Sequence, residues 1–199
     1  MIRHPEPAKD RTPTDCEQER NLVLAVLRGD SPAFHELYSA YRDRIYNLVV
    51  YSIGDSLQAQ DVVQTIFLNV FRGLGSFRFQ SSLATWIYRI AHNECQNHHR
   101  TRRTAQVPLE AILGSHDEID IKPISDEQHA HREREIILQE TLMQLPFKMR
   151  EVVVLRYIEG FSYEEMGRVL RCAPGTVASR LSRALAELEE RLRPFRRLL

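Results

Sequence analysis

Apolar residues recur at helical spacing along almost the whole chain, and no segment shows the strict alternation expected of a β-strand. In the first half, four such stretches each begin near a Ser or Thr that can cap a helix, and the first three end at Gly. The third carries Val63, Ile66, Phe67, Val70 and Phe71 on one side. The predicted helices run from Thr14 to Gly29, from Ser31 to Gly54, from Ser56 to Gly73, and from Ser82 or Leu83 to Arg103.

Residues 105–125 lose this periodicity, contain Pro108, Gly114 and Pro123, and concentrate acidic residues, which predicts a flexible acidic linker. Periodicity resumes near Asp126 and is interrupted at Pro146. We therefore expect an all-α chain of two small helical domains, residues 21–104 and 126–199, after an N-terminal extension of residues 1–20. The predicted C-terminal helices are 126–145, 149–158, 162–170 and 174 to about 192.

The last two helices have helix-turn-helix spacing, typical of a winged-helix-like four-helix domain. Ser162 and Glu165 form a capping box, and Pro174 opens the second helix after a three-residue turn. Small residues and arginines on the outer face would let this helix enter a DNA major groove. The buried positions are Val177, Leu181, Leu185 and Leu188, and the outward ones are Gly175, Thr176, Ser179, Arg180, Ser182 and Arg183. A plain helical hairpin with a basic face is an equal alternative for this pattern alone.

The fourth helix combines a buried stripe with a polar, cationic face. Trp86, Ile87 and Ile90 form the stripe. The preceding loop, residues 77–82, mixes aromatic rings, an arginine and amide or hydroxyl groups, which suits the capture of extruded bases. Phe77 is expected in the core, whereas Phe79 is left open. The residues predicted to be exposed on the helix are Thr85, Arg89, His92 and Asn93.

Composition excludes several classes of protein. The 199 residues are 43% hydrophobic and 27% charged, an ordinary globular mixture, and no apolar stretch approaches the roughly 20 residues of a membrane helix. The zero net charge divides into +2 for residues 1–104, −5 for 105–135 and +3 for 136–199. The N-terminus lacks a signal sequence, and three scattered cysteines favour reduced thiols, so we expect a cytoplasmic protein without membrane insertion.

Neither catalysis nor a cofactor is expected. No phosphate-binding glycine loop and no nucleophile–base pair accompanies the motifs, which predicts a protein that is not an enzyme. His92, Cys95, His98 and His99 lie at helical spacing and could share a metal ion. One helix rarely supplies a closed tetrahedral site, so we favour a polar strand-binding face and no metal.

Three sequence blocks carry a family resemblance: DVVQTIFLNVFRGLGSFR from Asp61, LATWIYRIAHN from Leu83, and LPFKMREVVVLRYIEGFSYEEMGRVLRCAPGTVASRLSRALAEL from Leu145. Together they resemble a bacterial RNA polymerase sigma factor of the extracytoplasmic-function (ECF) type, within the sigma-70 family. The likeness covers nearly everything except residues 1–20 and the linker.

The resemblance implies a factor that binds core RNA polymerase and directs promoter-specific initiation. Its partners would be the clamp of the largest subunit, the flap of the second subunit, and promoter DNA. Polymerase-binding residues would be Asp61, Gln64, Phe67, Asn69 and Arg72. The melted −10 element would meet Arg78, Phe79, Gln80, Ser81, Thr85, Arg89, His92 and Asn93. The duplex −35 element would meet Arg156, Thr176, Ser179, Arg180 and Arg183.

Departures from the family pattern leave some contacts open. Thr65 stands where an acidic residue is usual, and Ala178 where a basic one is frequent. Many relatives have Gly and an acid where Phe79 and Gln80 stand, which leaves the −10 base preference open. The resemblance also allows an anti-sigma partner, which the sequence neither requires nor excludes. The alternative function is a conventional helix-turn-helix regulator that binds duplex DNA without polymerase.

Overall fold

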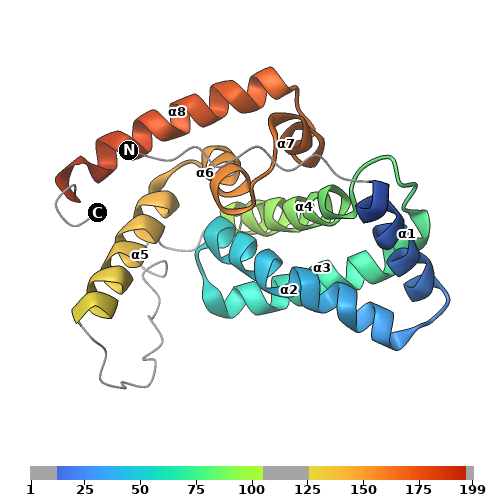
Figure 1. Cartoon of the computed structure of the whole chain (residues 1–199). Helices are drawn as coiled ribbons and strands as arrows, with labels where there is room; N and C mark the ends of the chain where they lie inside the picture. The colour runs from blue at the N-terminus through green and yellow to red at the C-terminus, as the bar shows by residue number, and fades with distance from the viewer. Residues whose placement is uncertain (1–12, 105–125, 196–199) are drawn as a thin grey trace.

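The computed structural model describes the backbone of residues 13–104 and 126–195, and every regular element in these ranges is helical (Figure 1). This confirms the all-α prediction. The predicted linker, residues 105–125, lies outside the described residues. The elements are α1 (Pro13–Leu27), α2 (Ser31–Ile53), α3 (Ser56–Gly73), the short 3₁₀ helix η1 (Leu74–Ser76), α4 (Leu83–Thr104), α5 (Asp126–Gln144), α6 (Phe147–Val153), the π-helical turn η3 (Val154–Ile158), α7 (Tyr163–Leu170), α8 (Pro174–Leu192) and the 3₁₀ helix η4 (Arg193–Phe195).

Helices α1 to α4 form the N-terminal lobe, in which α2, α3 and α4 pack against one another and α1 packs on α2. Their apolar stripes meet in the middle, as the helical periodicity predicts. Leu37, Ile45, Ile66 and Ile87 are completely buried there. Tyr88 is equally buried, although the sequence pattern placed only its neighbours in the core.

The capping residues of α2 and α3 and the start of α1 each differ from the prediction by one residue. Asp30, rather than Ser31, caps α2 by accepting a hydrogen bond from the Ala33 amide. Asp55, rather than Ser56, caps α3, because its carboxylate accepts from the Leu57 and Gln58 amides. Helix α1 begins at Pro13, so Thr14 lies inside it. Aspartate and serine are both favourable capping residues, and the one whose backbone is extended just before the helix occupies the capping position.

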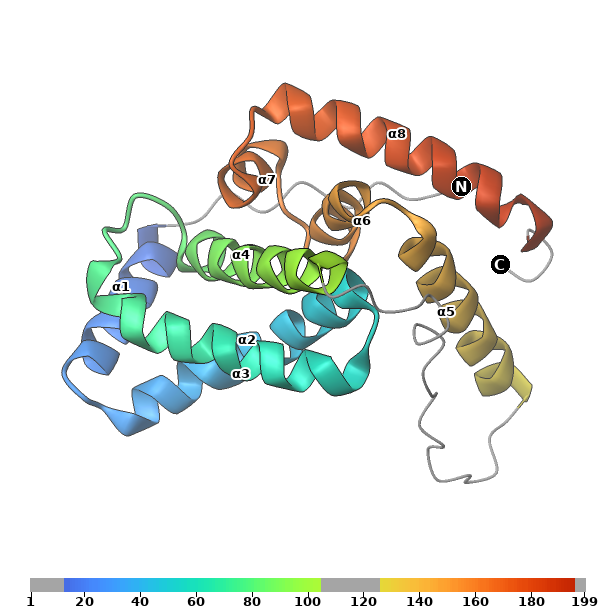
Figure 2. The same cartoon turned by 180° about the vertical axis from the view of Figure 1, so that it is seen from behind.

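Helices α5 to α8 form the C-terminal lobe. Helix α6 continues into η3 without a break, so the predicted 149–158 helix is confirmed with a change of winding in its second half. Helix α8 packs along α6, and the C-terminal part of α8 contacts α5 (Figure 1). Figure 2 shows α8 on the outside of the molecule, with α7 beneath its N-terminal end.

The two lobes are in contact, with α4 lying between α2 and α3 on one side and α6 and α7 on the other (Figures 1 and 2). Buried apolar residues of both lobes form one continuous cluster. Within residues 13–104 and 126–195, no helix combines the length and apolar character required to cross a membrane.

Candidate nucleic-acid interface

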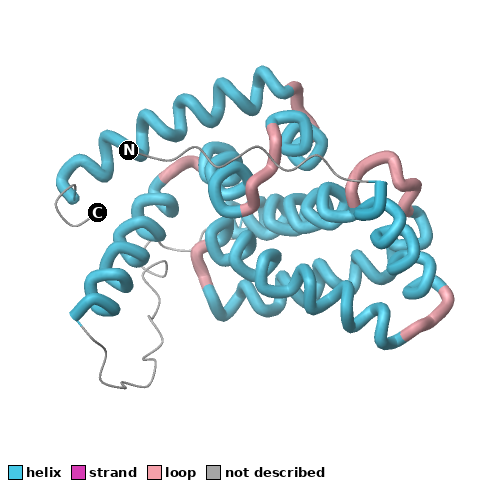
Figure 3. Tube along the Cα trace, viewed as in Figure 1, coloured by secondary structure: helices cyan, strands magenta, loops and turns pink. Residues whose placement is uncertain are grey.

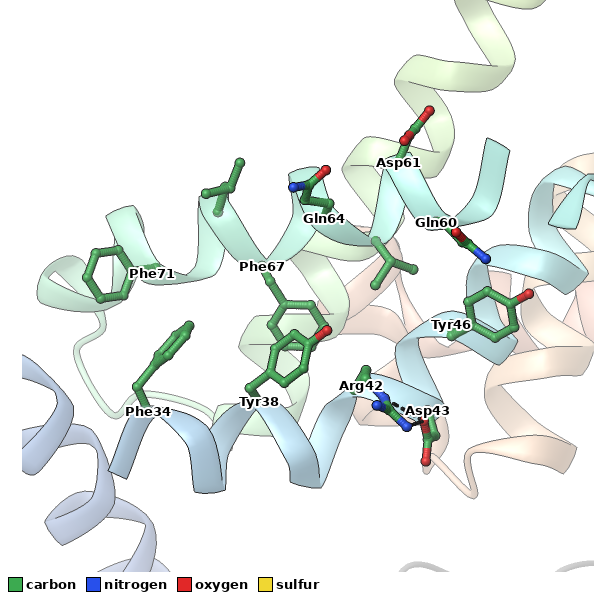
Figure 4. Close-up of a pocket in the computed structure, with 12 residues that line it drawn as sticks. Phe34, Tyr38, Arg42, Asp43, Tyr46, Gln60, Asp61, Gln64, Phe67 and Phe71 are labelled. Atoms are coloured by element: carbon green, nitrogen blue, oxygen red, sulfur yellow. Dashed lines mark hydrogen bonds and ion pairs between the residues drawn. The ribbon is translucent and has the colours of Figure 1, made fainter. Parts of the chain in front are cut away.

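A groove of about 1000 Å³ runs between α2 and α3 (Figure 4). Three of the residues predicted to bind polymerase, Asp61, Gln64 and Phe67, line it together. Phe67 forms its floor, since its side chain is buried and its ring centroid lies 4.6 Å from that of Tyr38. Phe71 was expected on the buried side of α3 but is 56% exposed at the groove edge. The groove therefore offers an apolar floor with polar and aromatic edges.

The other two predicted polymerase-binding residues lie outside this groove. Asn69 is half-buried, and its amide donates a hydrogen bond to Glu94 of α4 at 3.1 Å. Arg72 is exposed in the last turn of α3. The sequence missed the contribution of α2, because Phe34 and Tyr38 follow a core-like spacing although they also line the groove.

Residues 77–82 form the loop between η1 and α4, one of the pink segments of Figure 3. Phe77 is buried against Trp86, with ring centroids 5.4 Å apart, which confirms its predicted core position. Phe79 is 39% exposed and has φ = 56°, a left-handed conformation that glycine adopts more easily than phenylalanine. Arg78 and Gln80 are exposed beside it and Ser81 is half-buried. The loop thus presents one aromatic ring among polar side chains.

The predicted exposed face of α4 is partly wrong. Thr85 is buried, and its hydroxyl and amide both bond to Ser82, which caps the helix. His92 is buried as well, because its Nδ1 pairs with the carboxylate of Glu151 on α6. Arg89 and Asn93 are half-buried. Of the residues that the sequence assigns to the −10 element, His92 is therefore covered by the C-terminal lobe, while Arg78, Phe79 and Gln80 stay exposed.

Two acidic residues of the C-terminal lobe hold this junction, and the sequence analysis did not identify either. Besides the Glu151–His92 pair, Glu159 accepts hydrogen bonds from the Tyr88 hydroxyl and from Arg44 Nε, the latter at 3.0 Å. Arg150 donates to the Ser52 carbonyl oxygen across the junction at 2.9 Å. All these contacts join residues far apart in sequence, so no local pattern could reveal them.

Burial perturbs the ionisable groups at the junction. It raises the pKa of Glu151, an effect that the hydrogen bond and charge of His92 oppose. Burial likewise lowers the pKa of Arg150 to about 10, so the guanidinium still carries its charge at neutral pH. The junction thus buries both signs of charge, each beside a partner on the other lobe.

The helix-turn-helix is built as predicted. The Ser162 hydroxyl accepts from the Glu165 amide, and the Glu165 carboxylate accepts from the Ser162 amide, which completes the capping box. The turn is tight: a Cβ on Gly167 would lie 2.8 Å from the Cys172 carbonyl oxygen. Arg171 adopts the left-handed conformation that ends α7. These features fix the angle at which α8 leaves the turn.

Most of the predicted outward residues of α8 are exposed. Ser179 and Arg183 are exposed, whereas Thr176 and Arg180 are half-buried. Arg180 donates to the Cys172 sulfur at 3.7 Å, so its guanidinium rests against the turn. On the buried side lie Val177, Leu181, Ala184 and Leu188, with Leu185 half-buried.

Arg156 differs from the other predicted −35 residues because it lies in η3 rather than in α8. Its Nη1 donates to the Phe161 carbonyl oxygen at 2.9 Å, and its guanidinium lies over the Tyr163 ring. These contacts order the segment between η3 and α7.

The histidines and the cysteine of α4 point to different partners. Cys95 is buried near Ser52, His98 Nε2 lies 2.8 Å from the side-chain oxygen Oε1 of Gln58, and the His99 ring stacks on Phe147. In the part of the chain that the structure describes, no group of three or more His, Cys, Asp and Glu side chains is placed to hold a metal ion.

Comparison with known proteins gives two family matches. Residues 37–105 match sigma-70 region 2, and residues 135–188 match sigma-70 region 4. The chain is 38% identical over 187 residues to the RNA polymerase sigma-H factor of Pseudomonas aeruginosa, covering 91% of this chain and 97% of that protein. It is 34% identical over 180 residues to the ECF RNA polymerase sigma-E factor of Escherichia coli K12, covering 87% and 94%.

Two solved structures are similar over most of their length. CnrH, solved in complex with the cytosolic domain of CnrY, superposes with a TM-score of 0.64 at 25% identity, covering 88% of this chain and 97% of CnrH. The sigma factor RpoE of Bartonella quintana, solved with the anti-sigma factor NepR, gives a TM-score of 0.62 at 26% identity, covering 80% and 96%. The chain therefore belongs to the sigma-70 family of RNA polymerase sigma factors, as a member of the ECF type.

Proposed function

We propose that this sigma factor directs promoter-specific initiation through three surfaces, one for polymerase and two for DNA. The observation that carries the proposal is the built helix-turn-helix, which presents exposed Ser179 and Arg183 near the N-terminal end of α8. Serine and arginine there can meet base edges and phosphates of a duplex. The remaining proposed −35 contacts are Arg156, Thr176 and Arg180.

The groove between α2 and α3 would receive the clamp of the largest polymerase subunit. Its floor at Phe67 and its edge at Phe71 supply the apolar area on which affinity usually depends. Asp61 and Gln64 supply polar groups that would fix the orientation of the clamp. Asn69 and Arg72 would extend the contact along α3. The C-terminal lobe would meet the flap of the second subunit.

The loop 77–82 and α4 would hold the melted −10 strand. Phe79 offers a ring for base stacking, and Gln80 offers an amide for a base edge. Arg89 and Asn93 would follow along the helix, with Arg78 and Ser81 in the loop. Because His92 is buried against Glu151 of the C-terminal lobe, the lobes would have to separate before a strand could reach it, whereas Thr85 is bonded to Ser82 within its own lobe.

We further propose that residues 21–104 and 126–199 act as separate units in the holoenzyme, in a non-catalytic role that needs no cofactor. The factor would work in the cytoplasm, where the polymerase and the chromosome are. Of the two similar solved proteins, CnrH is bound to the cytosolic domain of CnrY, and the sigma factor RpoE is bound to the anti-sigma factor NepR. We propose an anti-sigma partner of the same kind for this chain. The alternative, a regulator that works without polymerase, is not favoured, because both sigma-70 regions match in order.

The test is multi-round transcription by purified bacterial core polymerase on pooled genomic fragments, with and without this protein. We expect new transcripts from discrete starts that share two spaced upstream motifs. Arg183→Ala should weaken selection of the upstream motif by about 1–3 kcal/mol if the side chain contacts a base. Arg193→Ala is the matched control, because Arg193 is exposed at the other end of α8.

Two results would count against the proposal. No new starts, together with specific duplex binding by the protein alone, would establish a conventional regulator instead. An equal loss of Arg183→Ala activity on scrambled upstream motifs would reduce Arg183 to a phosphate contact.

A further inference from the structure

Helix α1 precedes both matched family regions, yet two of its residues contact the proposed −10 surface. The Leu83 amide donates to Glu19 Oε1 at 2.7 Å, and the Arg20 guanidinium carbon lies 5.5 Å from the centroid of the Phe79 ring. Glu19 and Arg20 are adjacent in sequence, so one turn of α1 reaches both ends of the segment from Phe79 to Leu83. Neither contact is needed for the burial of α1 itself, which rests on Val23 and Val26.

The Glu19 contact fixes the start of α4. Leu83 is the first residue of that helix, and its amide is one of the donors that an α-helix leaves without an internal partner. A carboxylate at this position makes a charge-assisted hydrogen bond and also interacts favourably with the helix dipole. The Ser82 hydroxyl accepts from the Thr85 amide, whereas the Leu83 amide donates to α1.

The Arg20 contact fixes the ring of Phe79. The backbone of Phe79 has a left-handed conformation, which for a bulky residue persists only when neighbouring residues enforce it. Phe77 lies on one side with its ring centroid 4.8 Å away, and Phe77 is in turn anchored on Trp86. Arg20 supplies the second contact, and 39% of Phe79 is still exposed. The exposed part of the ring is thus presented in one orientation.

We infer that Glu19 and Arg20 are positioning residues for −10 base selection. They hold Phe79 and the start of α4 in the geometry in which a flipped base stacks on the ring. Stacking depends on ring orientation, so α1 affects which base is accepted, although it contacts no base itself. This inference rests on the proposed −10 role of the 77–82 loop.

The test is transcription by holoenzyme from a promoter library with a randomised −10 element and a constant upstream element. For Arg20→Ala we expect the ratio between best and worst base at the Phe79 position to fall about two- to fivefold, the equivalent of one exposed cation–π contact. Arg20→Lys keeps the charge without the planar guanidinium and should lose part of the same preference. Glu19→Gln should lower the same ratio. Arg28→Ala is the matched control, since Arg28 is exposed just after α1.

Four outcomes separate the possibilities. A shift of base preference in the Arg20 and Glu19 variants, with unchanged upstream selection and unchanged polymerase affinity, supports the inference. A uniform loss over the whole library, with a smaller salt dependence, would overturn it and make Arg20 a phosphate contact. If wild type shows no −10 preference at all, the proposed function itself fails. If wild type shows one that the variants retain, only this inference fails.

Discussion

Replacing Arg44 by alanine should strengthen the binding of a single-stranded −10 oligonucleotide, although the change removes a cation. Arg44 on α2 pairs with Glu159, whose side chain is only 2% exposed and also accepts from Tyr88 of α4. These contacts exist only while the lobes are together. Their loss therefore destabilises the closed arrangement, whereas the contact of the Arg44 guanidinium with the Tyr88 ring lies within the N-terminal lobe and is lost from both states.

The size of the effect follows from the exposure of the two partners. A fully exposed ion pair contributes about 0–1 kcal/mol, whereas breaking a buried pair costs about 3–5 kcal/mol. Arg44 is 48% exposed and Glu159 nearly buried, so an intermediate loss of about 1–3 kcal/mol is expected. This lowers the closed-to-open ratio by about 5- to 150-fold. The apparent Kd falls by the same factor while the closed state predominates.

The assay is fluorescence anisotropy of a labelled oligonucleotide, titrated with wild type, Arg44→Ala and Arg42→Ala at one ionic strength. Arg42 is the matched control, because it lies on the same helix and its ion pair with Asp43 stays within that helix. Counterion release predicts slightly weaker binding for any lost cation, as expected for Arg42→Ala. If Arg44→Ala also binds equally or more weakly, closure of the lobes does not compete with strand binding.

Three further predictions concern folding and reactivity. Trp86→Ala should lower the free energy of unfolding, measured by urea titration, by about 3–5 kcal/mol, because the ring is buried. An unchanged midpoint would show that Trp86 does not contribute to the core. Gly167→Ala should destabilise the C-terminal lobe by about 1–3 kcal/mol, since the new Cβ meets a backbone carbonyl, and wild-type thermal stability would contradict the tight turn. Burial raises the pKa of the Cys95 thiol, so a thiol reagent at pH 8 should modify exposed Cys16 and spare Cys95 until the protein unfolds. Because the pKa is raised only in the folded state, the contribution of the Cys95 thiol to the free energy of unfolding is lost as pH rises above the ordinary thiol value of 9.0. Urea titrations of wild type and Cys95→Ser at pH 8 and pH 10 would detect this loss.

The helices were predictable because their signals are local. Apolar residues at steps of three and four, glycine stops such as Gly54, and prolines such as Pro174 all act within a few residues. The capping box of Ser162 and Glu165 was predicted and observed for the same reason. The error at Asp30 has a local cause too, since adjacent residues competed for one capping position.

The burial of His92 was not predictable from the same kind of signal. Helical spacing shows which residues share a face, and His92 does share one with other polar residues. The residue that pairs with His92 on that face is Glu151, which is 59 positions away in sequence. For a related reason, only the α3 residues of the groove at Phe67 were named as polymerase-binding from the sequence. The second wall of the groove comes from α2, whose aromatic residues have the spacing of core positions.

The composition of the junction affects the cost of exposing the proposed −10 surface. Its long-range hydrogen bonds join charged groups, hydroxyls and carbonyl oxygens, which water can satisfy when the lobes separate. Buried ion pairs contribute little net stability, because desolvation offsets most of their attraction. In the described part of the chain, Arg150 Nε is buried at this junction without a hydrogen-bond partner, so closing leaves one donor unsatisfied. Apolar contacts, such as that between the Tyr88 and Phe161 rings, also join the lobes and oppose opening in water. The proposed contacts with polymerase and DNA would have to offset the cost of separating both kinds of contact.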